Sequence, residues 1–518
     1  MLVRDRLDVL FEDEEFADLY PSDGRPGFSP GQLALVSVLQ FAEDLSDRAA
    51  AQAVRTRIDW KYALGLELED TGFDYSLLCD FRARLVEGDA ADRMLQVMLK
   101  RLTEAGLLKS GGRQRTDATY VLAAVRRLSR LELAGESLRA ALEELAEIAP
   151  EWLQPLIDPE WDKRYGRRIE IRKVPGGPEA VIARAEVFGR DGQKVLAALW
   201  APDAPGRLRT LPQVEVLRQV WVHHYYWDEQ GQLRWRDGHA LPPASLRFDS
   251  PYDTDAHYCT KNGTEWSGYR VHYTETCEEQ RPGIVVHVAT TIAPVQDGQL
   301  TEQIHDDLAQ TALAPAEHVV DAAYIAPAHV QRAQPGTLRI NGHEYLQFRF
   351  AKADCLACPD RHPCTASATR PRSIALLPQP LHEIQVRNRL DQQTEEWQRR
   401  YAVRAGIEAT LSQTVRSNGL RLTRYRGLAK THVQHVLTAM ACNLTRTADW
   451  IAETPRGRTR SSRFHTLCTA AAGCPPKITN RVWPLGHAQG PRAQESGPQR
   501  RRVEDSDISG MRSPRGTL

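Results

Sequence analysis

The order of strand and helix signals in the middle of the chain restricts the fold more than any other feature. Residues 266–277 and 283–294 alternate apolar and polar side chains as neighbouring strands do, and residues 301–313 have the spacing of an amphipathic helix. Residues 316–324 give a third strand signal, and a further helical segment, residues 401–416, follows after a long separation. This order predicts an α/β fold with a mixed sheet and an insertion before the last helix.

Two aspartates stand where such strands are expected to end. Asp117 lies in the segment QRTDATYVLAAV, and Asp321 lies in EHVVDAAYIA. In both segments an apolar or β-favouring run reaches an Asp that is followed by small residues and a Tyr. Because open α/β sheets place their chemistry at the carboxyl ends of strands, we expect both acids at one edge of the sheet.

A third acid lies on the later helical segment. In YAVRAGIEATLSQTVR, two residues separate Tyr401 from Arg404, and three separate Arg404 from Glu408. On one continuous helix this spacing puts the three side chains on the same side, with the cation beside the acid. We therefore expect Arg404 to orient Glu408 toward a partner that all three side chains face.

Three converging carboxylates suit the cutting and joining of phosphodiesters. That chemistry requires an activated nucleophile, a stabilised leaving oxygen and charge compensation at phosphorus, which two Mg²⁺ or Mn²⁺ ions about 3.5–4 Å apart supply. Such hard ions prefer carboxylate oxygens as ligands. The alternative is that each acid is an ordinary surface or strand-end carboxylate, as most single Asp and Glu residues are. The combination of the three acids with Tyr401 and Arg404 favours the metal site.

The spacing of Tyr401, Arg404 and Glu408 resembles the signature of the DDE transposases of bacterial insertion sequences. That signature continues to a Lys at the position of Val415, and Arg416 is its neighbour here. Other segments resemble, in the same order, one large type of these elements, the insertion sequence 1182 type, related to the insertion sequence 4/5 superfamily. They are residues 250–279, 317–326, 355–365 and 416–446. The resemblance covers roughly residues 10 to 465, with Thr254 and His257 replacing the usual Pro and Arg in a loop.

The resemblance implies an RNase H-like catalytic domain that cuts and joins double-stranded DNA at the terminal inverted repeats of its own element. It implies a homodimer in the DNA complex, with Asp117 bridging two Mg²⁺ or Mn²⁺ ions and with Asp321 and Glu408 completing their coordination. Tyr401 is expected to contact the strand near the cut. The residues expected to contact the DNA backbone are Arg416, Arg421, Arg424, Arg426 and Lys430. The other interpretation is a non-catalytic or domesticated DNA-binding protein derived from such a transposase.

The charge distribution agrees with a DNA partner better than the net charge does. The formal net charge is zero, but the first hundred residues are rich in acids, as in FEDEEFADLYPSD. Between residues 401 and 446, Glu408 is accompanied by seven Lys and Arg residues. An ordinary solvated helix face usually mixes both signs, so this asymmetry favours a basic face around one acid.

The chain is expected to comprise three parts. Residues 1–105 read as an all-α N-terminal domain, with Ser29 before Pro30 as a helix start. The resemblance implies that this domain binds DNA ends, whereas its acidic surface suits dimerisation or a structural role equally well. Residues 106–450 are expected to form the catalytic domain, and residues 451–518 a disordered basic tail. The tail either adds non-specific attraction to phosphates or has no function.

Two insertions are expected within the catalytic domain. The first, near residues 125–165, is helical, with cations early and acids later. The segment 180–245 after it suggests irregular or mixed structure with a hairpin at residues 229–231. The adjacent His223 and His224 in that segment are interpreted as structural or surface groups rather than as metal ligands.

The second insertion, near residues 325–395, contains three closely spaced cysteines. Cys355, Cys358 and Cys364 include one two-residue spacing typical of a structural Zn²⁺ site, which usually needs four ligands. The fourth ligand would be His362 or a remote residue, and the alternative is a set of reduced thiols in a packed loop. The other six cysteines form no disulfide framework, which agrees with a reducing compartment.

The sequence predicts a cytoplasmic, nucleoid-associated protein with no membrane partner. No apolar run reaches the roughly 18 to 20 residues of a membrane span. The N-terminal segment MLVRDRLDVLFEDEEF is charged and does not resemble a signal peptide.

Overall fold

The computed structural model describes residues 1–21, 27–171, 177–243, 246–261, 263–324, 346–349, 352–358, 361–364, 373–376 and 379–454. The predicted tail, apart from its first four residues, lies outside the described residues. The chain divides into two compact units. One contains residues 1–341 and 385–466, and the other contains residues 342–384 and 467–518.

The N-terminal region is helical, as predicted. Its helices are α1 (Leu2–Leu7), α2 (Pro30–Ala42), α3 (Asp47–Thr56), α4 (Ile58–Leu64), α5 (Ser76–Glu87) and α6 (Ala91–Glu104). The start of α2 follows the predicted signal, because the Ser29 hydroxyl accepts a hydrogen bond from the Gln32 N–H and Pro30 occupies the first turn. Ser46 caps α3 in the same way through the Ala49 N–H.

A five-stranded mixed sheet forms the centre of the first unit. Its strands are β1 (Arg113–Leu122), β4 (His257–Lys261), β5 (Thr264–Thr276), β6 (Val285–Ile292) and β7 (Glu317–Val319). β1 pairs antiparallel with β5 on one side and parallel with β7 on the other. β4 and β6 both pair antiparallel with β5, so the two neighbouring strands predicted from the sequence are confirmed.

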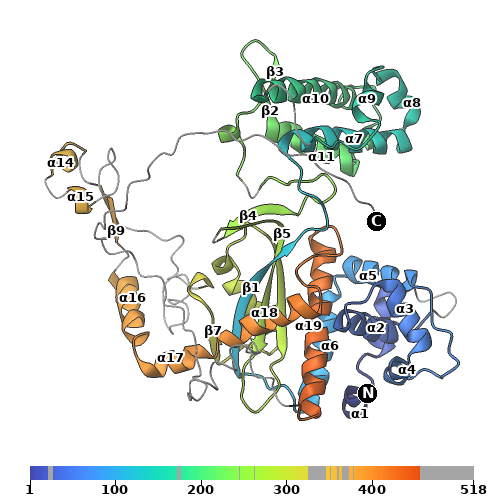
Figure 1. Ribbon diagram of the computed structural model, residues 1–518, viewed down its shortest axis with the longest axis vertical. Helices are drawn as coiled ribbons and strands as arrows, with labels where there is room; N and C mark the ends of the chain where they lie inside the picture. The colour runs from blue at the N-terminus through green and yellow to red at the C-terminus, as the bar shows by residue number, and fades with distance from the viewer. Residues whose placement is uncertain are drawn as a thin grey trace, which may run out of the picture. The chain divides into compact units, whose positions relative to one another are not determined.

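Helices cover both faces of this sheet. α18 (Ala405–Ser417) and α19 (Leu428–Ile451) lie on the face of Tyr273, whose hydroxyl donates to the main-chain carbonyl of His435 in α19. α12 (Thr301–Gln310) lies on the other face, where His305 and His318 share a hydrogen bond. Figure 1 shows α19, in orange, crossing beside the sheet and next to α6.

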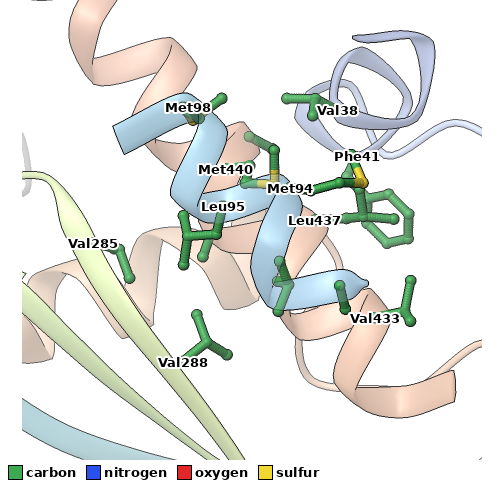
Figure 2. Close-up of a cluster of buried hydrophobic side chains, with 14 of the residues drawn as sticks. Val38, Phe41, Met94, Leu95, Met98, Val285, Val288, Val433, Leu437 and Met440 are labelled. Carbon is green, nitrogen blue, oxygen red and sulfur yellow. The ribbon is translucent and has the colours of Figure 1, made fainter. Parts of the chain in front are cut away.

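The largest hydrophobic core joins the N-terminal helices to this sheet. Figure 2 shows Met94, Leu95 and Met98 of α6 beside Leu437 and Met440 of α19, with other apolar side chains around them. These further side chains come from α2, β6 and the start of α19 and are Val38, Phe41, Val285, Val288 and Val433. Helices α6 and α19 therefore bury apolar faces between α2 and β6, and the N-terminal helices form part of the same core as the five-stranded sheet.

A helical insertion connects β1 to β4 and has a hydrophobic core of its own. It contains α7 (Arg130–Ile148), α8 (Pro150–Leu153), α9 (Trp161–Tyr165), α10 (Gly177–Leu199), α11 (Pro212–His224), β2 (Tyr225–Trp227) and β3 (Leu233–Trp235). The predicted hairpin is confirmed as β2 and β3. The prediction of irregular or mixed structure before it was wrong, because α10 and α11 bury Phe188 and Trp221 in this second core.

The second unit contains β8 (Leu346–Arg349), α14 (Lys352–Ala357), α15 (Arg361–Cys364) and β9 (Ser373–Leu376). β8 and β9 pair antiparallel, with Leu346 opposite Leu376. The chain then enters α16 (Gln379–Asp391) and α17 (Glu395–Ala402), which lead to α18.

Candidate active site

The register of the sheet brings the two predicted aspartates together. β7 pairs with β1 so that Arg113 lies opposite Glu317 and Arg115 opposite Val319, an offset of 204 residues. Two residues further along, the same offset places Asp321 beside Asp117, and strand alternation puts Asp117 on the face of Arg115. Asp321 follows the end of β7 as predicted, but Asp117 lies within β1 and not at its end.

Tyr401 lies on α17 and Glu408 on α18, whereas Arg404 lies in the turn between the two helices as the N-cap of α18. α17 ends at Ala402 and α18 begins at Ala405, so the prediction of a continuous helix was wrong. The Arg404 N–H bonds the Tyr401 carbonyl at 2.9 Å, three residues back, instead of the usual carbonyl four residues back.

Two arginines of β1 bind main-chain carbonyls where α17 ends, before α18 begins. Arg113 donates to the main-chain carbonyl of Arg400, and Arg115 donates to that of Val403. Gly406 gives the Arg115 side chain room, since a Cβ at Gly406 would lie 2.0 Å from an Arg115 nitrogen. The strand that carries Asp117 therefore also fixes the start of the helix that carries Glu408.

All three predicted acids surround the guanidinium of Arg404. Arg404 Nη2 lies 2.8 Å from Asp117 Oδ2 and 3.6 Å from Asp321 Oδ2, while Nη1 lies 2.9 Å from Glu408 Oε1. Arg404 thus forms ion pairs with acids from β1, from the end of β7 and from α18. The spacing had predicted its contact with Glu408, and the tertiary structure adds the two aspartates.

The three acids differ in their access to solvent. Glu408 is 61% exposed, whereas Asp117 is 16% exposed. Burial raises the pKa of Asp117 to about 6, because Arg404 opposes this increase only in part and the neighbouring charges of Asp321 and Glu408 add to it. A mostly buried carboxyl with a raised pKa beside two other acids is a candidate functional group.

A buried charge network, which the sequence analysis did not identify, lies behind the acids. The fully buried Glu275 on β5 accepts hydrogen bonds from Arg115 at 2.7 Å, from Arg446 at 2.7 Å and from Thr410 at 2.6 Å. These residues come from β1, α19 and α18. The signal that could have found the network is a charged residue on a central strand, where the neighbouring residues are buried.

Only part of the predicted basic face is free to meet DNA. Arg416, Arg426 and Lys430 are exposed. Arg421 instead stacks on the Tyr120 ring at 3.7 Å, and Arg424, which is also exposed, pairs with Asp44 of the N-terminal region. Two further positions face inward, since Arg446 joins the Glu275 network and Val415, at the Lys position of the signature, packs against the core.

The cysteine and histidine predictions concern other parts of the chain. Cys355 is buried, Cys358 and Cys364 are exposed, and the side chain of His362 lies outside the described residues. His224 is buried against Trp235 with stacked rings, in agreement with a structural role. The zinc site stays a prediction.

The donor chemistry of the three acids suits a hard divalent ion, but their present arrangement serves a guanidinium. Within the part of the chain that the structure describes, no three His, Cys, Asp or Glu side chains are placed to hold a metal ion. Arg404 occupies the space between Asp117, Asp321 and Glu408. Carboxylate oxygens are nevertheless the ligands that Mg²⁺ and Mn²⁺ prefer, so metal binding would require Arg404 to release at least one acid.

Two family models match the chain. Residues 2–84 match a transposase domain (DUF772), and residues 328–448 match a transposase DDE domain. The second match includes Arg404 and Glu408 but neither Asp117 nor Asp321. No curated protein sequence and no solved structure matches the chain. Among the described residues, no helix is long and apolar enough to cross a membrane.

Proposed function

Since this chain belongs to the DDE-type transposases of insertion sequences, we propose that Asp117, Asp321 and Glu408 are its catalytic carboxylates. In this proposal the protein cuts and joins double-stranded DNA at the terminal inverted repeats of its own element. The observation that carries the proposal is the convergence of the three acids on Arg404. They come from positions 117, 321 and 408, which are far apart in the sequence, so the tertiary fold is what brings them close to one side chain.

The sheet supports an RNase H-like assignment for the catalytic domain. Three strands that are antiparallel neighbours in the sheet, β1, β5 and β6, are followed by β7, which returns through α12 to lie parallel to β1 on its other side. This is the strand order predicted from the sequence, and Asp117 lies on β1, between β5 and β7. The acid-bearing helix α18 then packs on the sheet beside it.

The proposed roles follow from exposure and charge. Asp117, Asp321 and Glu408 would hold two Mg²⁺ or Mn²⁺ ions, which supply charge compensation and an activated nucleophile when bound. Arg404 holds the carboxylates together and neutralises part of their mutual repulsion. Tyr401 stacks on Trp397 at 4.6 Å, and in this proposal its ring would contact the DNA strand near the cut. Exposed Arg416, Arg426 and Lys430 would contact backbone phosphates, and a homodimer would hold two DNA ends.

Substitution of each acid tests the proposal. Asp117→Ala, Asp321→Ala and Glu408→Ala should each abolish Mg²⁺- or Mn²⁺-dependent cleavage of DNA that carries the terminal repeat, while DNA affinity stays within about threefold. Asp306→Ala is the matched control, because Asp306 is an exposed acid on α12, on the opposite face of the sheet. Normal cleavage by any of the three variants would remove that acid from the site. DNA binding without cleavage by the wild type would favour a non-catalytic derivative.

A further inference from the structure

A basic pocket lies where the helical insertion joins the sheet, apart from the three acids. It is a cavity of about 450 Å³, here called the insertion pocket, and its lining includes Arg127, Arg130, Arg247 and His224. Arg130 begins α7 and Arg127 lies three residues before it, whereas Arg247 lies on the segment that returns from the insertion to β4. Tyr258 of β4 completes this part of the wall and stacks under Arg127 at 3.8 Å.

The cations of the insertion pocket outnumber its acids. Asp249 is the one carboxylate among the described lining residues, and it lies 3.4 Å from Arg127. Arg130 donates to the main-chain carbonyl of Arg236 at 2.9 Å and stacks on Trp235, so its contacts are not with an acid. Arg247 forms no ion pair within the described part of the chain, and its Nε is buried without a hydrogen-bond partner.

The excess positive charge of the insertion pocket affects the neighbouring groups. Burial lowers the pKa of Arg130, and the positive charge of Arg247 lowers it further. Burial also lowers the pKa of His224 to about 3, with Arg130 as the next cause. Guanidiniums that repel one another across a cavity create a positive potential there, and a bound anion would relieve it.

The distance to the acids fits one continuous DNA duplex. Tyr258 pairs with Ser267 on β5, and Asp117 pairs with Tyr273 on the same strand. These positions are six residues apart, or about 20 Å at roughly 3.3 Å per residue. Because one DNA strand advances about 3.4 Å per nucleotide, this span corresponds to about six base pairs.

We propose that the insertion pocket binds a backbone phosphate of the DNA duplex, about six base pairs from the bond that is cut. Arg130 and Arg247 would donate to the phosphate oxygens, and planar guanidiniums match that geometry. The proposal rests on the proposed function for the identity of the duplex. It gives the helical insertion a role in gripping DNA that is separate from the three carboxylates.

Salt-dependent DNA binding tests the pocket. The probe is a fluorescently labelled duplex, its affinity for the full chain measured by anisotropy at several NaCl concentrations without divalent metal. Arg247→Gln should weaken binding about three- to tenfold and reduce the slope of log affinity against log salt by about 0.9, the value for one lost phosphate contact. Arg247→Lys, which keeps the charge, should retain the wild-type slope.

Arg218→Gln is the matched control, because Arg218 lies on the same insertion but pairs with Glu215 at the surface. Equal affinity and slope for Arg247→Gln and Arg218→Gln would overturn the proposal, even if the wild type cleaves DNA. Loss of slope in Arg247→Gln alone would support it, even if the wild type does not cleave. Saturable binding of inorganic phosphate that needs Arg247, with unchanged DNA affinity in the variant, would assign the pocket to a free anion and overturn it.

Discussion

Glu275 offers the sharpest test of how the fold supports the site. The Glu275→Gln substitution keeps the shape of the side chain but removes the charge that Arg115 and Arg446 share. Breaking a buried ion pair costs about 3–5 kcal/mol. Both arginines keep other acceptors, the carbonyls of Val403 and Gly283, and remain 14% and 19% exposed. We therefore expect a loss of about 2–4 kcal/mol in the free energy of unfolding.

Urea denaturation at neutral pH measures this loss, with Glu215→Gln as the control. Glu215 and Arg218 are 40% and 44% exposed, so the control should lose less than about 1 kcal/mol. Because Glu275 also accepts from Thr410 of α18, the variant should cleave DNA more slowly even where it is fully folded. A loss no larger than that of the control would refute the view that this network holds α18 against β1.

Two further predictions concern the acids themselves. Arg404→Gln should raise Mn²⁺ affinity about tenfold or more, because it removes a cation that occupies the space between the acids. Calorimetry measures this affinity, and weaker Mn²⁺ binding would show that Arg404 helps to form the metal site. Since the folded state raises the pKa of Asp117 from 3.8 to about 6, the stability that Asp117 contributes in its protonated form is present below about pH 3.8 and lost as pH rises through about 6. The free energy of unfolding of Asp117→Asn should therefore exceed that of the wild type by about 3 kcal/mol at pH 8 and by little near pH 3.5. Thermal unfolding midpoints that show no such dependence on pH would contradict the raised pKa.

Local sequence patterns predicted much of the fold because they depend on neighbours along the chain. The alternation in residues 266–277 and 283–294 predicted β5 and β6, and the cap at Ser29 predicted the start of α2. Local patterns did not predict helix α10, because its apolar side chains pack in a separate core that local sequence does not reveal. They also failed between α17 and α18, where arginines from β1 take the helix carbonyls.

The sequence by itself determined which residues are candidates for the proposed chemistry. Asp117, Asp321, Arg404 and Glu408 could be nominated from their local context, and the resemblance of Tyr401, Arg404 and Glu408 to a transposase signature agrees with the family matches. Only the tertiary structure decided how these residues meet, because the 204-residue offset between β1 and β7 and the packing of α18 depend on contacts between distant segments.

The tertiary structure also decided which charges remain free. Arg421, Arg424 and Arg446 belong to the same basic segment as Arg426 and Lys430, yet the fold directs the first three to Tyr120, Asp44 and Glu275. No sequence pattern marked Arg247, which lacks an ion pair among the described residues once the insertion has returned to the sheet. Whether a charge is neutralised or available to a ligand depends on its neighbours in space, which a linear pattern does not specify.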